Sequence, residues 1–192
     1  MSSQVSGGPR QGLNLRQAET YERLLAAGEA ELRAVGREAL TVRTVAQRAG
    51  VSPATAYTYL ASRNHLFAEL FARLLTDNPA PEPTQGTAYE RVRAVVHHFA
   101  ALLHDAPQIT AAVTPALLGD DPEVERLRLR IGAEFARRFA AALGDANEPD
   151  VLDALLLAFS GALLQVGMGL MTYPEFRDRL DAVTAVILKE AS

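Results

Sequence analysis

Apolar residues recur at every third or fourth position along almost the whole chain. This period places them on one face of an α-helix, whereas a half-buried strand requires strict alternation of apolar and polar residues. No stretch alternates convincingly in that way, and no internal repeat is visible. We therefore predict an all-α protein of about nine helices and no sheet, whose 48% of hydrophobic residues can supply a buried core.

Glycine, proline, hydroxyl and carboxylate residues indicate where these helices begin and end. Gly36 and Gly144 are expected to end helices, and Ser62 is expected to cap the start of one. Asp120 or Asp121 should cap a helix that begins with proline. The expected helices span about Leu15–Val35, two short segments within Thr41–Leu60, a segment from Ser62 to Leu75, Ala88–His104, Gln108–Leu118, Pro122–Leu143, an apolar stretch after Asn147, and Pro174–Glu190.

Two segments interrupt or precede the helical pattern. Residues 77–86, DNPAPEPTQG, contain three prolines and a glycine and cannot continue a helix. Residues 1–14 are rich in Gly, Ser and Gln and lack the apolar run of a signal peptide, so we expect a flexible N-terminal arm there. The chain has no cysteine, which excludes disulfides and thiolate metal sites. These features favour a cytoplasmic protein.

The net charge of −4 hides a difference between the two parts of the chain. Residues 1–77 carry nine arginines and seven carboxylates, a net charge of +2. Residues 78–192 carry ten basic and sixteen acidic side chains, a net charge of −6. Only the N-terminal part is therefore expected to approach nucleic-acid phosphates without strong repulsion.

Residues 41–66, TVRTVAQRAGVSPATAYTYLASRNHL, have the pattern of a helix-turn-helix, in which two short helices flank a tight turn. Thr41 can cap the first helix, and Ser52, followed by Pro53, can cap the second. Gly50 stands where the chain must turn sharply, a position at which a positive φ favours glycine. On spacing alone, these two helices could also be packing elements that never meet DNA.

If the second helix enters the major groove, its outward residues are small apolar groups, hydroxyls and an aromatic ring, which suit thymine methyls and phosphate oxygens. Arg43 is then the candidate for a bidentate contact to guanine. Arg63 follows a cap residue and would meet a phosphate at a helix N-terminus. The outward residues are Pro53, Ala54, Thr55, Thr58 and Tyr59.

The segment Ala49–Leu66 reads A-G-V-S-x-x-T-x-Y-x-Y-L followed by S-R-N-x-L, and over Gln17–Leu75 the chain resembles the TetR family of repressors. The resemblance implies a helix-turn-helix DNA-binding domain at residues 15–61 and a ligand-binding and dimerisation domain at residues 62–192. It implies base contacts from Arg43, Pro53, Ala54 and Tyr57 or Tyr59, and phosphate contacts from Thr41, Thr44, Thr55, Tyr57 and Arg63. We also expect Ser52 and Thr58 to belong to the DNA-binding surface.

The same resemblance implies a homodimeric repressor that binds a palindromic operator and is released by a small effector. Two recognition helices would then meet half-sites about 34 Å apart, one turn of DNA. An activator of the same fold is the alternative. A small helical enzyme or a pure interaction protein belongs to a different class, and the sequence has no H-E-x-x-H motif, no G-x-S-x-G motif and no phosphate loop. No cofactor is expected.

Residues 154–173, ALLLAFSGALLQVGMGLMTY, contain no charge over twenty positions, which is long enough for a membrane span. Gln165 near the middle, and the absence of a flanking cluster of Lys or Arg, favour a helix buried within protein. In TetR-like proteins the last two helices pair with those of a second subunit. The resemblance therefore implies a homodimer through about Leu152–Tyr173 and Phe176–Leu188.

By the same resemblance, the central helices should enclose an effector. The candidate lining is apolar, so a lipophilic molecule such as an acyl or steroid thioester or a hydrophobic antibiotic is expected, although many of these side chains would serve equally as ordinary core. The layout also resembles actinobacterial regulators of lipid or sterol catabolism. The candidate residues are Val95, Phe99, Leu102, Leu103, Ile109, Val113, Leu117, Ile131, Phe135, Phe139, Phe159 and Leu163.

Three histidines raise the question of a metal site. His97 and His104 lie seven residues apart and share a helical face, and His98 is adjacent. No carboxylate stands at the i+4 spacing that would complete a compact site. We therefore expect these histidines to be solvated or to cap helices, and we expect no metal.

Overall fold

The computed structural model describes residues 15–80 and 85–190, and within them it contains nine α-helices, one short 3-10 helix and no strand. The all-α prediction is therefore confirmed for this part of the chain. The predicted arm, residues 1–14, lies outside the described residues. The helices are α1 (Leu15–Ala39), α2 (Val42–Ala49), α3 (Pro53–Tyr59), α4 (Arg63–Asp77), α5 (Ala88–Asp105), α6 (Pro107–Leu117), α7 (Pro122–Leu143), the 3-10 helix η1 (Gly144–Ala146), α8 (Pro149–Gly167) and α9 (Tyr173–Glu190).

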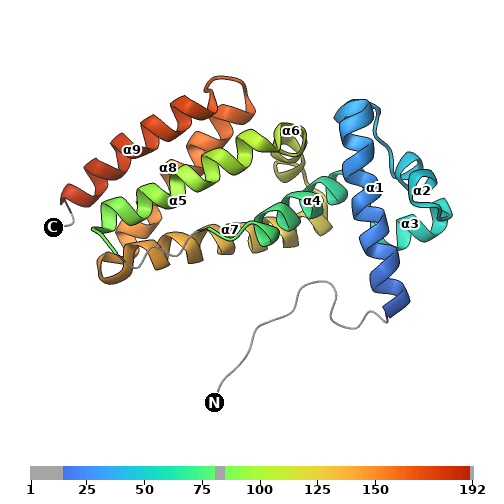
Figure 1. The fold of residues 1–192 in the computed structure, drawn as a ribbon, viewed down its shortest axis with the longest axis horizontal. Helices are drawn as coiled ribbons and strands as arrows, with labels where there is room; N and C mark the ends of the chain where they lie inside the picture. Colours follow the sequence, from blue (N-terminus) through green and yellow to red (C-terminus); the bar gives the residue numbers. More distant parts are fainter. Residues whose placement is uncertain (1–14, 81–84, 191–192) are drawn as a thin grey trace, which may run out of the picture.

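The molecule is elongated, with α1, α2 and α3 grouped at one end (Figure 1). Helix α4 leads from this group into a bundle of α5, α7, α8 and α9, and α6 lies where the two parts meet. A single cluster of buried apolar residues runs through both parts, from Tyr21 in α1 to Leu180 in α9. The α1–α3 group is therefore packed onto the bundle and not merely tethered to it.

Most of the predicted helix ends are confirmed. Gly36 leaves the helical conformation near the end of α1, with φ of 74°, and Gly144 follows α7 with φ of 57°. The Ser62 hydroxyl accepts a hydrogen bond from the backbone N–H of His65 and so caps α4. Of the two aspartates considered for α7, Asp121 is the cap.

The uncharged run 154–173 does not form one helix, which corrects the expectation of a continuous apolar helix to Tyr173. Helix α8 begins earlier, at Pro149, and ends at Gly167. Beyond it the backbone folds back, because the N–H of Gly169 donates to Val166 O and the N–H of Leu170 donates to Gln165 O. Gly169 has φ of 72°, a conformation that other residues rarely adopt. The last turn of the run belongs to a connection, and α9 follows directly.

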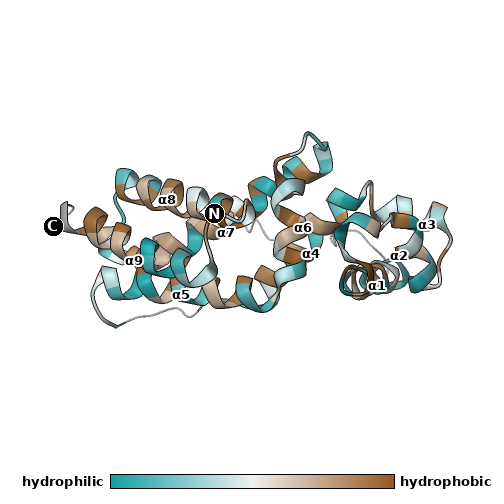
Figure 2. Ribbon diagram, turned by 90° about the horizontal axis from the view of Figure 1, so that it is seen from above, coloured by the Kyte–Doolittle hydropathy of each residue, from teal (hydrophilic) through white to brown (hydrophobic). Residues whose placement is uncertain are grey.

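Within the described residues, α8 is the one helix that is long and apolar enough to cross a membrane by length and composition. It packs against α9, α7 and α6, and Asp150 and Asp153 lie in its first turns. Figure 2 shows α8 along one side of the bundle, with hydrophobic residues recurring on it. Its outward face includes Leu157, which is 75% exposed, and Met168. The described part of the chain therefore leaves this apolar face uncovered.

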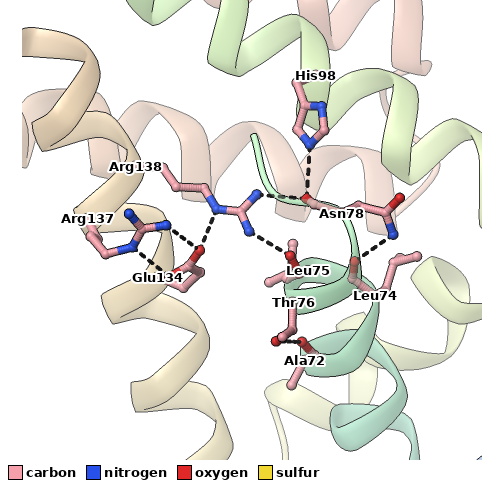
Figure 3. Close-up of polar contacts among 9 residues, drawn as sticks. All are labelled: Ala72, Leu74, Leu75, Thr76, Asn78, His98, Glu134, Arg137 and Arg138. Atoms are coloured by element: carbon pink, nitrogen blue, oxygen red, sulfur yellow. Dashed lines mark hydrogen bonds and ion pairs between the residues drawn. The ribbon is translucent and has the colours of Figure 1, made fainter. Parts of the chain in front are cut away.

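The C-terminal end of α4 is fixed by a buried arginine from α7 (Figure 3). The Arg138 guanidinium donates to Leu75 O at 2.6 Å and to Asn78 O at 3.3 Å. Its Nε donates to the Glu134 carboxylate at 2.6 Å, and its carbon centre lies 5.2 Å from the centroid of the Phe99 ring. Helix carbonyls at a C-terminus carry partial negative charge, so a cation stabilises them there.

Replacing Arg138 with methionine should destabilise the protein strongly. The change leaves the Leu75 carbonyl without its donor, removes one of the two partners of Asn78 O and leaves Glu134 without a buried cation, which we expect to lower the free energy of unfolding by about 2–4 kcal/mol. The matched control is Arg137→Met, because Arg137 binds the same carboxylate but is 56% exposed and should change stability by less than about 0.5 kcal/mol. Urea unfolding of both variants measures the difference, and equal losses would contradict the structural role of Arg138.

Candidate nucleic-acid interface and ligand cavity

The two short helices and their turn have the predicted local structure. Thr41 and Thr44 form a capping box at α2, since each side-chain oxygen accepts a hydrogen bond from the other residue's backbone N–H, at 3.1 and 3.2 Å. Gly50 takes φ of 68° and ends α2. Ser52 caps α3 by accepting from the N–H of Thr55 at 3.0 Å, with Pro53 at the first helical position. These contacts fix the start of each helix and the turn between them.

The α3 helix has one buried side and one exposed side. Ala56 and Leu60 are fully buried against the rest of the domain. Pro53, Ala54 and Thr58 are exposed, and Tyr57 is 55% exposed. The outward side therefore offers the methyl groups, hydroxyls and phenol ring that the sequence suggested for base and phosphate contacts.

The two tyrosines of α3 differ in position. Tyr59 is half-buried, and its ring lies 6.3 Å from that of Tyr21 in α1, measured between centroids. Among the described residues, Tyr57 makes no such ring contact, and it is 55% exposed. Of the alternatives left open by the sequence, Tyr57 is the one that is available to an external partner.

Several hydroxyl groups expected to face DNA are already engaged in the free protein. Those of Thr41, Thr44, Ser52 and Thr55 take part in the helix caps, and the Thr58 hydroxyl donates to Ala54 O at 3.1 Å. Arg43 and Arg63 are exposed and make no hydrogen bond or ion pair with any residue in the described part of the chain. The cations are therefore the groups most ready to meet phosphates or base edges.

An ion pair holds α2 against α1. Arg48 Nε lies 2.7 Å from the Glu31 carboxylate, and Glu31 is almost completely buried. A buried carboxylate requires such a partner, because its desolvation is otherwise unfavourable. The pair therefore helps to hold the helix-turn-helix against α1.

A polar network connects α4 with α7. Glu69 is buried, and its carboxylate lies 3.5 Å from Nε2 of His65 and 3.2 Å from Nη2 of Arg130. Burial by itself would raise the pKa of Glu69, but the contacts with His65 and Arg130 outweigh it, so the pKa is lowered. Nδ1 of His65 accepts from the N–H of Ala61, which leaves Nε2 to donate to Glu69. Glu69 thus stays charged at neutral pH.

A second link joins the first turns of the same helices. The Ser62 hydroxyl, which caps α4, donates to Asp121 Oδ2 at 2.5 Å, and Asp121 Oδ1 accepts from the N–H of Glu123 at 3.0 Å. The hydrogen bond from Ser62 lowers the pKa of Asp121. The cap residues of α4 and α7, which are far apart in the sequence, therefore meet directly at the start of α4.

The bundle contains a mainly apolar cavity of about 230 Å³, which is partly open to solvent. Helices α4 to α8 all contribute to its wall. Hydroxyl groups of Thr110, Thr114 and Ser160 and the guanidinium of Arg128 are the polar groups in its lining. A cavity with mostly apolar walls and few polar groups suits a lipophilic molecule with a polar end.

Part of the predicted ligand set lines this cavity. Leu103, Val113, Leu117, Ile131, Phe135 and Leu163 are in its wall. Val95, Phe99, Leu102, Ile109, Phe139 and Phe159 are not, and Phe99 and Phe159 instead lie at the centre of a group of packed rings. The polar members of the wall were not among the residues predicted from the sequence. Thr110 and Thr114, spaced four apart on an otherwise apolar helix, and Ser160 within α8 were the available signals.

The histidines have partners in the protein. His97 Nε2 lies 2.8 Å from Asp181 Oδ2, a carboxylate 84 residues away, and His98 Nε2 lies 3.2 Å from Asn78 O. His104 packs edge-on against the ring of Tyr173. No group of three or more possible metal ligands is found among the described residues.

Comparisons with known proteins agree on one family. Residues 24–70 match the model of the bacterial regulatory proteins of the tetR family. The chain is similar to the HTH-type transcriptional regulator Rv0767c of Mycobacterium tuberculosis, with 45% identity over 93% of this chain and 85% of that protein. It is also similar to the transcriptional repressor KstR of Rhodococcus jostii, with 30% identity over 69% of this chain and 63% of that protein. Among solved structures, the repressor FadR of Thermus thermophilus in complex with lauroyl-CoA has a TM-score of 0.68 at 17% identity, covering 88% of this chain and 93% of that one.

The two tyrosines of α3 should respond differently to truncation. Tyr59→Ala removes a ring packed on Tyr21 and should lower the free energy of unfolding by about 1–3 kcal/mol. Tyr57→Ala should change it by less than about 0.5 kcal/mol, because this ring is exposed. Urea unfolding checks both values. A large loss of stability in Tyr57→Ala would place this ring in the fold and not on the outward surface.

Proposed function

The chain belongs to the TetR family of helix-turn-helix transcriptional regulators, and on that premise we propose that it is a homodimeric repressor that a lipophilic effector releases from a palindromic operator. As a member of this family it is a DNA-binding regulator and not an enzyme. The observation that carries the proposal is the exposed outward face of α3, held in position by side-chain caps on both short helices. Its place of action would be the cytoplasm, where operator DNA is accessible.

The proposed DNA contacts follow from exposure and charge. Arg43, at the start of α2, reads a base edge, most simply a guanine. Pro53, Ala54 and Tyr57 lie against bases or the sugar-phosphate backbone, and Arg63 at the N-terminus of α4 contacts a phosphate. The capping hydroxyls of Thr41, Thr44, Ser52 and Thr55, together with Thr58 and Tyr59, border this surface. The pattern favours many phosphate contacts and few base contacts.

Repression is favoured over activation by the relatives. KstR and FadR are both transcriptional repressors. A repressor needs only to occupy its operator, whereas an activator needs an additional surface for the transcription machinery.

Dimerisation would bury the exposed apolar face of α8 and α9 against a second subunit. Leu157, Leu164 and Met168 on α8, with Val183 and Val186 on α9, are all exposed in the single chain. Apolar side chains on neighbouring helices that no other part of the chain covers are typical of an interface between subunits. A two-fold arrangement through these helices would give two recognition helices for the two halves of a palindrome.

The effector would occupy the cavity between α4 and α8. Its mainly apolar wall supports a lipophilic ligand, and FadR, which has the same fold, was solved with lauroyl-CoA. Phe71 of α4 is part of the wall, so a ligand there touches the helix that begins directly after the helix-turn-helix. Displacement of α4 would alter the spacing of the two recognition helices and weaken operator binding.

Binding to the DNA upstream of the protein's own coding region should be tight and should weaken as salt rises. Arg43→Ala should cost about 1–3 kcal/mol per half-site and relax the preference for one base pair, whereas Arg63→Ala should weaken all sequences similarly and reduce the salt dependence. Fluorescence anisotropy at two salt concentrations measures these effects. Arg126→Ala is the control, because Arg126 lies on α7 and pairs with Glu123.

Two results would count against this proposal. If the Arg43→Ala or the Arg63→Ala variant binds the operator as tightly as the unchanged protein, the DNA contact assigned to that arginine is wrong. If the protein binds this site no more tightly than random DNA, and a genome-wide selection of bound fragments also finds no preferred sequence, the protein is not a sequence-specific regulator.

Leu157→Glu should convert the dimer into a monomer. The substitution places a charge at the centre of the proposed interface, and we expect the dimer dissociation constant to rise at least 30-fold, or about 2 kcal/mol. Val35→Glu, an equally drastic change at an exposed residue of α1, should leave the protein dimeric. Sedimentation velocity gives the mass of each variant, and a dimeric Leu157→Glu protein would exclude this face as the interface.

A further inference from the structure

Arg128 lies at the rim of the cavity and differs from every other residue of the wall. Among the described residues that line the cavity, it alone carries a charge. Its side chain comes from α7 and is exposed, as are Leu118 and Leu164 of the same wall, so we place these residues where the cavity opens to solvent. A single cation at the mouth of an apolar chamber is the arrangement expected for a molecule with an apolar body and an anionic end.

In the free protein this guanidinium caps the end of α6. Nε donates to Leu117 O at 2.6 Å, and Nη2 donates to Gly119 O at 2.6 Å. Both acceptors belong to the carbonyls at or just beyond the helix C-terminus, where the helix dipole favours a cation. Neither bond uses Nη1, which makes no hydrogen bond to any residue in the described part of the chain.

The turn that Arg128 holds leads directly to the start of α4. Two residues beyond Gly119, Asp121 caps α7 and accepts the hydrogen bond from Ser62. Ser62 in turn caps α4 through the N–H of His65. A change at the end of α6 therefore reaches α4 through three hydrogen bonds, Arg128–Gly119, Asp121–Ser62 and Ser62–His65, and the short backbone segment 119–121 that joins the first two.

We propose that the effector of this cavity carries an anionic group, which Arg128 binds at the rim, and that this contact draws the guanidinium away from Leu117 O and Gly119 O. The inference rests on the proposed role of the cavity as the effector site. With its cap removed, the α6–α7 turn loosens and the Asp121–Ser62 bond at the start of α4 weakens. The charged end of the effector, and not only its apolar body, thereby triggers release from DNA.

The chemistry of arginine supports this exchange of partners. A guanidinium binds a carboxylate or phosphate more strongly than it binds neutral carbonyls, because the bond is charge-assisted and can be bidentate. The two carbonyls can be satisfied by water once the cation leaves, because the turn is at the surface. The exchange is therefore possible without leaving buried groups unpaired.

The test compares three probes that share a twelve-carbon chain. Laurate ends in a carboxylate, lauroyl-CoA carries phosphates beyond a thioester, and 1-dodecanol is neutral. Calorimetric titration of the full-length protein below the micelle concentration of each probe should show at least one anionic probe binding about tenfold or more tightly than dodecanol. Arg128→Met should lose this preference and keep its affinity for dodecanol. Arg126→Met, which removes another exposed arginine of α7 that does not line the cavity, should keep the preference.

The outcomes separate this inference from the proposed function. A preference for laurate identifies a carboxylate as the anionic group, and a preference confined to lauroyl-CoA identifies the phosphates. If dodecanol binds as tightly as both anionic probes, or if Arg128→Met keeps the preference, the role of Arg128 is overturned while a lipophilic effector stands. If none of the probes binds, both the effector site and the role of Arg128 fall.

Hydrogen exchange tests the path to α4. In the presence of the preferred anionic probe, the amide hydrogens of Gly119, Glu123 and His65 should exchange faster than in its absence, because their acceptors belong to the turn and the two caps. Dodecanol at saturation should not produce this increase. Unchanged or slower exchange at these amides with the anionic probe bound would overturn the transmission through the turn.

Discussion

The connection between the two ends of this molecule depends on a cation held inside it. Arg138 is almost completely buried, and a charge in that position is unfavourable unless its donors find acceptors. Glu134, Leu75 O and Asn78 O provide those partners, and the Phe99 ring lies alongside. Two of the acceptors are the final carbonyls of α4. The requirement to satisfy one buried charge therefore fixes where α4 ends against α7.

Helix α4 is held by α7 along its whole length. Asp121 meets its first turn, Arg130 meets its middle through Glu69, and Arg138 meets its end. These three contacts differ in burial, because Arg138 is buried, the Arg130 side chain is 41% exposed and Asp121 lies in a surface turn. The end of α4 is thus the fixed point and its beginning is the adjustable one. A helix held in this way can pivot at the end that adjoins the helix-turn-helix.

The sequence predicts what is decided locally and misses what is decided by distant partners. Caps such as Thr41, Ser52 and Ser62 were predictable because the side chain and the amide it binds are three residues apart. The Ser62–Asp121 and Arg138–Leu75 contacts join residues 59 and 63 positions apart, and no local pattern indicates them. The uncharged run 154–173 predicted an apolar helix but not its end, because Gly169 turns the backbone within a stretch of uniform hydropathy. Periodicity likewise found the apolar faces of the bundle but did not separate cavity wall from core, because both are apolar.

The uncovered face of α8 has a consequence for how the chain folds. A helix with exposed leucines loses part of the driving force of burial while its chain is alone, and regains it only when a second chain arrives. If two copies meet there as proposed, folding and association become one equilibrium, and the temperature at which the protein unfolds rises with its concentration. A cell that makes few copies of this regulator would then hold it nearer to unfolding, so that its abundance and its conformational stability are set together.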